Sequence, residues 1–265
     1  MKIVIIGGGN MGGAIARGLV SGSMFKVNDI TVIDVNKKPL ELLQSQLPGI
    51  QTALSDYDSL PNADIIIMAV KPWFIEDVIL DIKFKLDYGK QILVSIAAGV
   101  TLSMMEKSLS KPKEDISLPA LFRVIPNTAI AIGQSMTLVS TTNASDTQKA
   151  LILKIFNELG KAILMDEDRL PAGIALTSCG IAYLFRYVRA ASLAGVELGF
   201  YPSQAQELIV NTMKGAAELL LHTNVNPEVE IDKVITPGGI TIKGLNELEA
   251  NGFSDAIIKA IKTSK

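Results

Sequence analysis

The chain has 265 residues, of which 48% are hydrophobic and 20% charged, as expected of a folded protein long enough for two domains. Its formal net charge of −2 gives no electrostatic reason to expect nucleic acid or an anionic membrane as a partner. The single cysteine, Cys179, excludes an intramolecular disulfide, and no signal peptide or membrane-spanning run is recognisable. We therefore expect a cytoplasmic protein.

Short apolar segments alternate with helix-like segments over residues 1–165. Compact runs rich in Val and Ile are typical of buried parallel strands. The predicted strands are Ile3–Ile6, Ile30–Ile33, Ile65–Val70, Ile92–Ile96, Phe122–Ile125, Met136–Val139 and Ala162–Met165. Helices are predicted from about Asn10, around Leu40–Leu47 and at Asp146–Leu159. This alternation predicts a doubly wound, Rossmann-type parallel sheet.

Residues 166–265 carry only helical patterns, at Ala172–Gly199, Ser203–His222 and Thr241–Ile261. Within them, Pro171–Phe185 contains no charged residue. A helix that is apolar on every face has to be buried on every face, and fewer than 100 residues cannot easily cover it. The pattern predicts an all-helical domain that forms at least a homodimer.

A G-x-G-x-x-G motif follows the first predicted strand and starts the first helix, with its glycines at Gly7, Gly9 and Gly12. In that context the first glycine permits a tight turn, the second lets a pyrophosphate approach, and the third packs helix against strand. Asn10 and Met11 lie between them, at the helix N-terminus that would bind the pyrophosphate. The motif predicts a dinucleotide site, and a tight turn without a ligand is the alternative.

Asp34 ends the second predicted strand, 22 residues after Gly12. A carboxylate at this place accepts a hydrogen bond from the ribose 2′-OH and repels a 2′-phosphate. Lys37 and Lys38 follow closely and offer charge to a 2′-phosphate. The sequence thus favours NAD slightly and leaves NADP open.

Five stretches occur in the order found in pyrroline-5-carboxylate reductases, which the chain resembles over nearly its whole length: Gly7–Val20, Ala69–Pro72, Ser95–Leu102, Arg123–Thr128 and Thr236–Thr241. The resemblance implies reduction of the cyclic imine pyrroline-5-carboxylate to L-proline by NAD(P)H, the last step of proline biosynthesis. It also implies a Rossmann domain followed by a helical dimerisation domain, in dimers that often assemble further. Finally, it implies that the cofactor is bordered by Ala69, Val70, Lys71, Pro72, Ala97 and Ala98, with Asn127 near the nicotinamide.

The loop Thr236–Thr241 resembles the one that holds the substrate carboxylate in this family. Two glycines before a helix start expose backbone N–H groups to an anion, here those of Gly238, Gly239, Ile240 and Thr241. The Thr241 hydroxyl is predicted to bond the ring nitrogen, which makes it the candidate catalytic group. A glycine turn that only caps the last long helix is the alternative.

One stretch departs from the family. Where the family usually reads Ser-Gly-Ser-Gly-Pro-Ala-Tyr beside the nicotinamide, Thr177–Tyr183 reads Thr-Ser-Cys-Gly-Ile-Ala-Tyr. Cys179 thus takes the place of a serine at the substrate, and a thiol is the weaker donor. A non-catalytic, regulatory dinucleotide-binding paralogue and a reductase of a related imine stay open.

Two further alternatives find little support in the sequence. β-Hydroxyacid dehydrogenases share the architecture but resemble one another in a catalytic lysine on the first long helix, and residues 172–200 contain no lysine. No Cys/His cluster or close acidic pair has metal-ligand spacing, so no metal is expected. The only histidine, His222, is interpreted as a polar residue near a helix end.

Overall fold

A computed structural model describes residues 1–111 and 117–265. The chain divides into two compact units, Met1–Ser178 and Cys179–Lys265. This division lies later than the one we predict at residue 165, because residues after it still pack on the first unit. Leu170 is fully buried there against Ile125 and Leu138.

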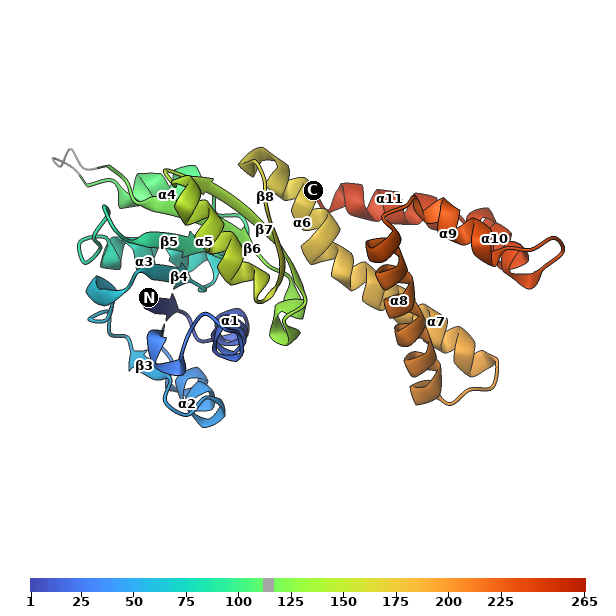
Figure 1. Ribbon diagram of the computed structural model, residues 1–265, viewed down its shortest axis with the longest axis horizontal. Helices are drawn as coiled ribbons and strands as arrows, with labels where there is room; N and C mark the ends of the chain where they lie inside the picture. The colour runs from blue at the N-terminus through green and yellow to red at the C-terminus, as the bar shows by residue number, and fades with distance from the viewer. Residues whose placement is uncertain (112–116) are drawn as a thin grey trace. The chain divides into compact units, whose positions relative to one another are not determined.

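The first unit is built on one mostly parallel sheet (Figure 1). Its described strands, in the spatial order β3-β2-β1-β4-β5-β6-β7-β8, are paired in parallel except for β6 with β7. Their bounds are β1 Ile3–Ile6, β2 Ile30–Asp34, β3 Gln51–Leu54, β4 Ile65–Met68, β5 Ile92–Ser95, β6 Ala120–Ile125, β7 Ser135–Thr142 and β8 Gly160–Leu164. The predicted Rossmann-type fold is confirmed.

Of the described strands, all but β3 are predicted from the sequence. Its residues, Gln-Thr-Ala-Leu, are exposed or half-buried throughout, so they lack the apolar run by which buried strands are recognised. The strand lies at the edge of the sheet and pairs only with β2 among the described residues.

Helices cover both faces of this sheet. One face packs against α1 (Asn10–Ser21), α2 (Lys37–Gln46) and α5 (Asp146–Asn157), the other against α3 (Ile75–Ile82) and α4 (Leu102–Leu109). Helices α3 and α4, which have eight residues each, are not predicted from the sequence. Among the described residues of this unit, the remaining helical segments are five 3-10 turns, α6 and a π-helix: η1 Val27–Asp29, η2 Leu60–Asn62, η3 Pro72–Phe74, η4 Thr128–Ile132, η5 Glu167–Arg169, α6 Leu170–Ile174 and η6 Ala175–Cys179.

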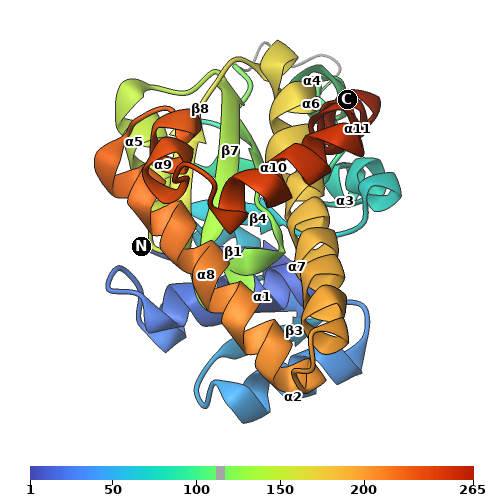
Figure 2. The same cartoon turned by 90° about the vertical axis from the view of Figure 1, so that its right-hand side faces the viewer.

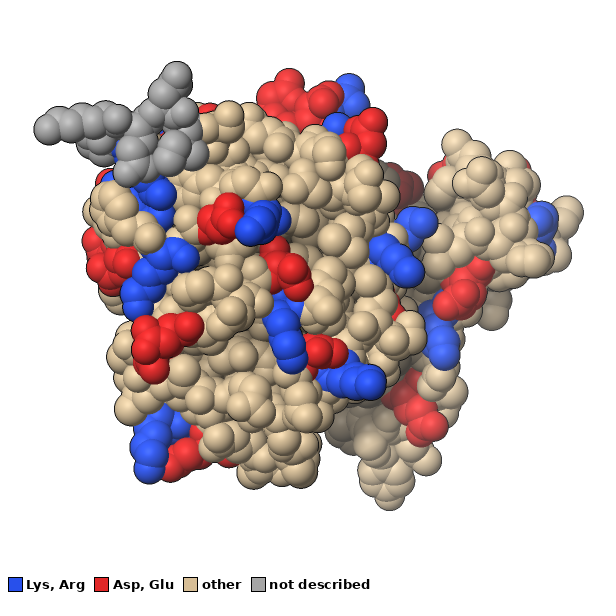
Figure 3. All heavy atoms as spheres, turned by 60° about the vertical axis from the view of Figure 1, so that its left-hand side comes forward, with Lys and Arg blue, Asp and Glu red and all other residues tan. Residues whose placement is uncertain are grey.

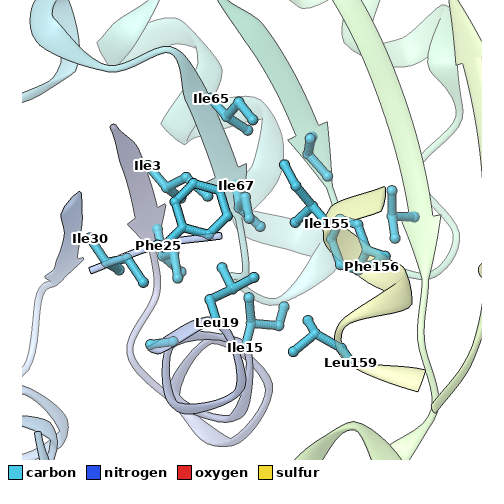
Figure 4. Packing of buried hydrophobic residues seen from close by; sticks show 14 of the residues in the cluster. Ile3, Ile15, Leu19, Phe25, Ile30, Ile65, Ile67, Ile155, Phe156 and Leu159 are labelled. Atoms are coloured by element: carbon cyan, nitrogen blue, oxygen red, sulfur yellow. The ribbon is translucent and has the colours of Figure 1, made fainter. Parts of the chain in front are cut away.

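The core between α1, α5 and the sheet consists of branched aliphatic and aromatic side chains (Figure 4). Ile15 and Leu19 of α1 face Ile155 and Phe156 of α5, and all four are at most 1% exposed. Burying one such side chain contributes roughly 1.5–3 kcal/mol. This packing holds the first strand and the helix after it in a fixed geometry.

The second unit consists of helices in its described residues, as predicted: α7 Gly180–Glu197, α8 Pro202–Thr223, α9 Pro227–Val234, α10 Ile240–Ala250 and α11 Phe253–Thr263. Helices α7 and α8 contact each other and diverge from the turn that joins them (Figure 2). The predicted helix 241–261 is two helices, because Gly252 has a φ of 75° that ends the first and begins the second. Helix α9 was missed. Leu184 and Phe185 of α7 are 53% and 62% exposed on this single chain.

Candidate dinucleotide and substrate site

The predicted cofactor residues of the first unit lie in loops at one edge of the sheet. Strands β1, β2, β4, β5 and β6 run parallel, so their carboxyl ends meet at the same edge. The strand order reverses at β1, which has β2 on one side and β4 on the other. In open α/β sheets ligands bind at the carboxyl edge beside such a reversal.

The three glycines of the motif differ in what surrounds them. Gly7 has a φ of +106°, and a Cβ on it would lie 2.7 Å from the carbonyl oxygen of Ala69. A Cβ on Gly12 would lie 1.9 Å from the carbonyl oxygen of Gly7. In contrast, a Cβ on Gly9 would have nothing within 4 Å. Gly7 and Gly12 therefore serve the packing of the chain itself, whereas Gly9 leaves space in front of α1.

The start of α1 suits an anion such as a pyrophosphate. Gly9 is the N-cap residue and makes no side-chain cap, and the first turn holds no acidic residue. The first N–H groups of a helix have no partner within it and carry the positive end of its dipole. Asn10 and Met11 lie in this turn, with Asn10 exposed and Met11 half-buried. The cradle fits the dinucleotide that the motif predicts.

The carboxylate of Asp34 supports the glycine turn from the end of β2. Its Oδ2 accepts a hydrogen bond from Gly8 N at 2.7 Å, and its Oδ1 accepts one from Asn36 N at 2.8 Å. Each carboxylate oxygen has a second lone pair for another donor. The nearby Lys37 pairs with Glu41, with Nζ 2.9 Å from Oε1.

A mainly apolar crevice of about 240 Å³ opens beside Gly7, Asp34 and Val70. Six of its lining residues were not singled out from the sequence: Val35, Tyr57, Phe74, Asp77, Val78 and Asp81. Burial raises the pKa of the Tyr57 phenol, and the Asp81 carboxylate raises it further. The signal that could have found two of them is the i,i+4 spacing of Asp77 and Asp81 in α3, directly after the Val-Lys-Pro turn.

The remaining predicted cofactor residues lie in the neighbouring loops. Lys71 is exposed and caps η3, which begins with Pro72. Ala97 is buried and Ala98 exposed in the loop after β5. Asn127 follows β6; its Oδ1 accepts from Ala129 N at 3.1 Å and its Nδ2 donates to the Thr177 carbonyl oxygen at 3.4 Å.

The predicted substrate loop lies in the second unit, where Gly239 is the N-cap residue of α10. Gly238 has a φ of +72°, and Gly239 N donates to the Thr236 carbonyl oxygen at 2.9 Å. The expectation that all four N–H groups are offered to an anion is therefore wrong for Gly239, because the turn closes on itself. The N–H groups of Ile240 and Thr241 lie in the first helical turn, where a helix supplies no partner.

Cys179, which departs from the family pattern, ends the π-helix Ala175–Cys179. Its thiol is free and the residue is half-buried. Single π-helical turns within α-helices occur frequently at functional sites. His222, by contrast, is exposed near the end of α8.

Comparison with known proteins agrees with these features. Residues 167–265 match the family described as pyrroline-5-carboxylate reductase dimerisation, and residues 2–99 match the one described as NADP oxidoreductase, coenzyme F420-dependent. The pyrroline-5-carboxylate reductase of Aquifex aeolicus (strain VF5) is 34% identical over 98% of this chain and 94% of its own length. The chain belongs to the pyrroline-5-carboxylate reductase family.

Two further members of the pyrroline-5-carboxylate reductase family support this assignment. Pyrroline-5-carboxylate reductase 1 of Dictyostelium discoideum is 39% identical over 99% of this chain, which spans 48% of that relative's length. The crystal structure of Plasmodium falciparum pyrroline carboxylate reductase with NADP bound superposes with a TM-score of 0.86 at 25% identity, covering 100% of this chain and 95% of the other. The family resemblance inferred from the motifs is confirmed.

The charge distribution on the surface and the apolarity of the helices bear on possible partners. On the face in Figure 3, acidic and basic side chains of the described residues are interspersed rather than gathered by sign. Among the residues that the structure describes, no helix combines the length and apolarity needed to cross a membrane.

Proposed function

We propose that the chain reduces 1-pyrroline-5-carboxylate to L-proline with NADH or NADPH, the last step of proline biosynthesis. The observation that carries this proposal is the identity to pyrroline-5-carboxylate reductases along 98% of the chain, which includes both compact units. The oxidoreductase class follows from the same identity.

The cofactor's pyrophosphate is assigned to the start of α1, at Gly9, Asn10 and Met11. What supports this is the open space in front of Gly9 and the absence of an acidic residue in the first turn of α1. The adenosine end is assigned to the crevice beside Asp34, and the nicotinamide end to the loops that contain Ala97, Ala98 and Asn127. When bound, the nicotinamide supplies the hydride.

NAD is proposed as the preferred cofactor. Three carboxylates line the adenosine crevice, those of Asp34, Asp77 and Asp81, and each would repel a 2′-phosphate. Lys37, which could counter them, pairs with Glu41 in this structure. The Plasmodium relative, with NADP in its crystal structure, shows that the family also accommodates the phosphorylated cofactor.

The substrate carboxylate is assigned to the loop Thr236–Thr241. The N–H groups of Gly238, Ile240 and Thr241 are its proposed donors, and the Thr241 hydroxyl is the proposed partner of the ring nitrogen. Cys179 is assigned to the substrate as well. Because an iminium carbon accepts hydride directly, the protein's task is to hold and orient the reactants.

The second unit is proposed to form a homodimer, with higher assembly left open. Large apolar side chains at the start of α7 support this, since Leu184 and Phe185 are 53% and 62% exposed on the single chain. Exposed apolar surface of this kind marks a protein interface. The cytoplasmic location stays a prediction.

The test is an assay of purified protein with pyrroline-5-carboxylate and either NADH or NADPH, followed at the nicotinamide absorbance band. We expect cofactor oxidation that depends on the imine. The second candidate, a regulatory paralogue, is favoured by the altered stretch Ser178–Ile181. Tight cofactor binding without imine-dependent oxidation would support the paralogue and contradict the reductase.

A further inference from the structure

Arg123 is a charged residue inside a buried strand. All six residues of β6 are buried, and Arg123 is only 5% exposed. A guanidinium stays charged in proteins, and burying a charge is costly unless it is paired. Its partner is Glu167, the first residue of η5, with Oε1 3.0 Å from Nη1 of Arg123.

Glu167 makes a second contact with the same oxygen. Its Oε1 accepts a hydrogen bond from Leu102 N at 2.8 Å. Leu102 is the first residue of α4, so the carboxylate also interacts favourably with the positive end of that helix. Glu167 therefore joins Arg123 of β6 to the point where the loop after β5 ends.

The beginning of that loop is fixed by Ser95, the last residue of β5. Ser95 lies directly opposite Arg123 in the sheet and is fully buried. Its Oγ accepts from Ala97 N at 3.3 Å. On the other side of Arg123, Ser140 of β7 donates from its Oγ to the Met165 carbonyl oxygen at 2.6 Å. A buried polar row, Ser95–Arg123–Ser140, thus holds the loop after β5 and the segment that leads to Glu167.

We propose that Arg123 and Glu167 are positioning residues that hold the loop 96–101 in place for the cofactor. The loop contains Ala97 and Ala98, which are assigned to the nicotinamide end of the cofactor. That assignment is the one part of the inference that rests on the proposed function. Gly99 in the middle of the loop has a φ of +83°, and a Cβ on it would have nothing within 4 Å. Ala97 and Val100 pack into the core on either side of Gly99, and the Arg123–Glu167 pair fixes the end of the loop at Leu102.

The first test replaces Glu167 with alanine and measures affinity for NADH, or for NADPH if the wild type binds that more tightly, by fluorescence titration without substrate. Losing the anchor should weaken binding by roughly ten-fold, the scale on which a supporting network changes affinity. Hydrogen exchange of the peptide that covers residues 96–102 should become faster. Unchanged affinity and unchanged exchange would overturn the proposal.

A double variant separates positioning from stability. Arg123→Met with Glu167→Met removes both charges, which restores much of the stability that a single unpaired charge would lose. The Leu102 N–H stays without its acceptor, so we expect a recovered Tm with cofactor binding still weak. If affinity returns together with the Tm, the pair is only structural and the proposal fails.

The matched control is Asp146→Asn, which breaks an exposed ion pair of the same unit. Asp146 lies 2.9 Å from Lys149 and its side chain is 98% exposed, so cofactor affinity and loop exchange should stay at wild-type values. If Glu167→Ala does not fold, the double variant decides, because it removes the acceptor of the Leu102 N–H without leaving an unpaired buried charge: weakened binding supports the proposal and wild-type binding contradicts it. A wild type that binds cofactor but reduces no imine would refute the proposed function and leave this test intact.

Discussion

The carboxylate of Asp34 accepts a hydrogen bond from the backbone N–H of Gly8 at 2.7 Å. The residue proposed to recognise the ribose therefore also supports the glycine turn that receives the pyrophosphate. A change at Asp34 acts on both, so its effects on charge and on loop support have to be separated by the choice of substitution.

Asp34→Asn keeps an oxygen that can accept from Gly8, removes the negative charge, and gives up only the acceptor for Asn36 N. We expect the ratio of NADPH to NADH affinity to rise by about five- to ten-fold, which corresponds to about 1 kcal/mol for one repulsive contact. Asp77→Asn, which also lines the crevice, should shift the ratio in the same direction without touching the glycine turn. A wild type that already prefers NADPH in competition titrations would contradict this, and would show that Lys37 and Lys38 attract the 2′-phosphate more strongly than the carboxylates repel it.

Gly9→Ala and Gly12→Ala form a matched pair in one turn. A Cβ on Gly9 meets nothing within 4 Å and its φ of −66° suits alanine, so thermal unfolding should be nearly unchanged. The methyl group occupies the space assigned to the pyrophosphate, and cofactor affinity should fall by at least about ten-fold. Gly12→Ala should instead lower the Tm sharply, because its Cβ would lie 1.9 Å from the Gly7 carbonyl oxygen. Wild-type cofactor affinity in Gly9→Ala would contradict the assignment of the pyrophosphate to this turn.

Thr241→Ala tests the proposed catalytic hydroxyl. The backbone N–H groups of the loop survive the substitution, so the KM for the imine should change little. Turnover should fall by roughly 10- to 100-fold, since a hydrogen bond that involves a charged partner contributes about 1.5–3 kcal/mol. Thr241→Ser keeps the hydroxyl and should retain most of the activity. Unchanged turnover with a lower Tm in Thr241→Ala would make the residue a helix-start residue only.

Static light scattering at micromolar concentration tests the homodimer. We expect at least twice the mass of the 28.4 kDa chain. Phe185→Asp places a charge on a side chain that is 62% exposed on the single chain. The single chain should therefore still fold, whereas association of two chains should be weaker. A stable monomer in the wild type would contradict the prediction.

The sequence by itself determined the features that depend on neighbours along the chain. A run such as Ile3–Ile6 followed by Gly7, Gly9 and Gly12 predicts a strand, a tight turn and a helix start, because each step is a local property of the backbone. The order of the family motifs, from the glycine turn to Thr236–Thr241, led to the reductase family in the same way. Short amphipathic helices such as α3 could not be predicted, since the pattern of eight residues is too short to distinguish a helix from a strand.

Only the tertiary structure decided which distant residues share a contact. Arg123 and Glu167 are 44 residues apart, and Glu167 and Leu102 are 65 apart; the order of the strands brings them together. The same holds for Asp34 and Gly8, and for the Tyr57 and Asp81 side chains that complete the crevice. Such contacts follow from how the sheet is assembled, and no local pattern in the chain encodes the pairing of its strands.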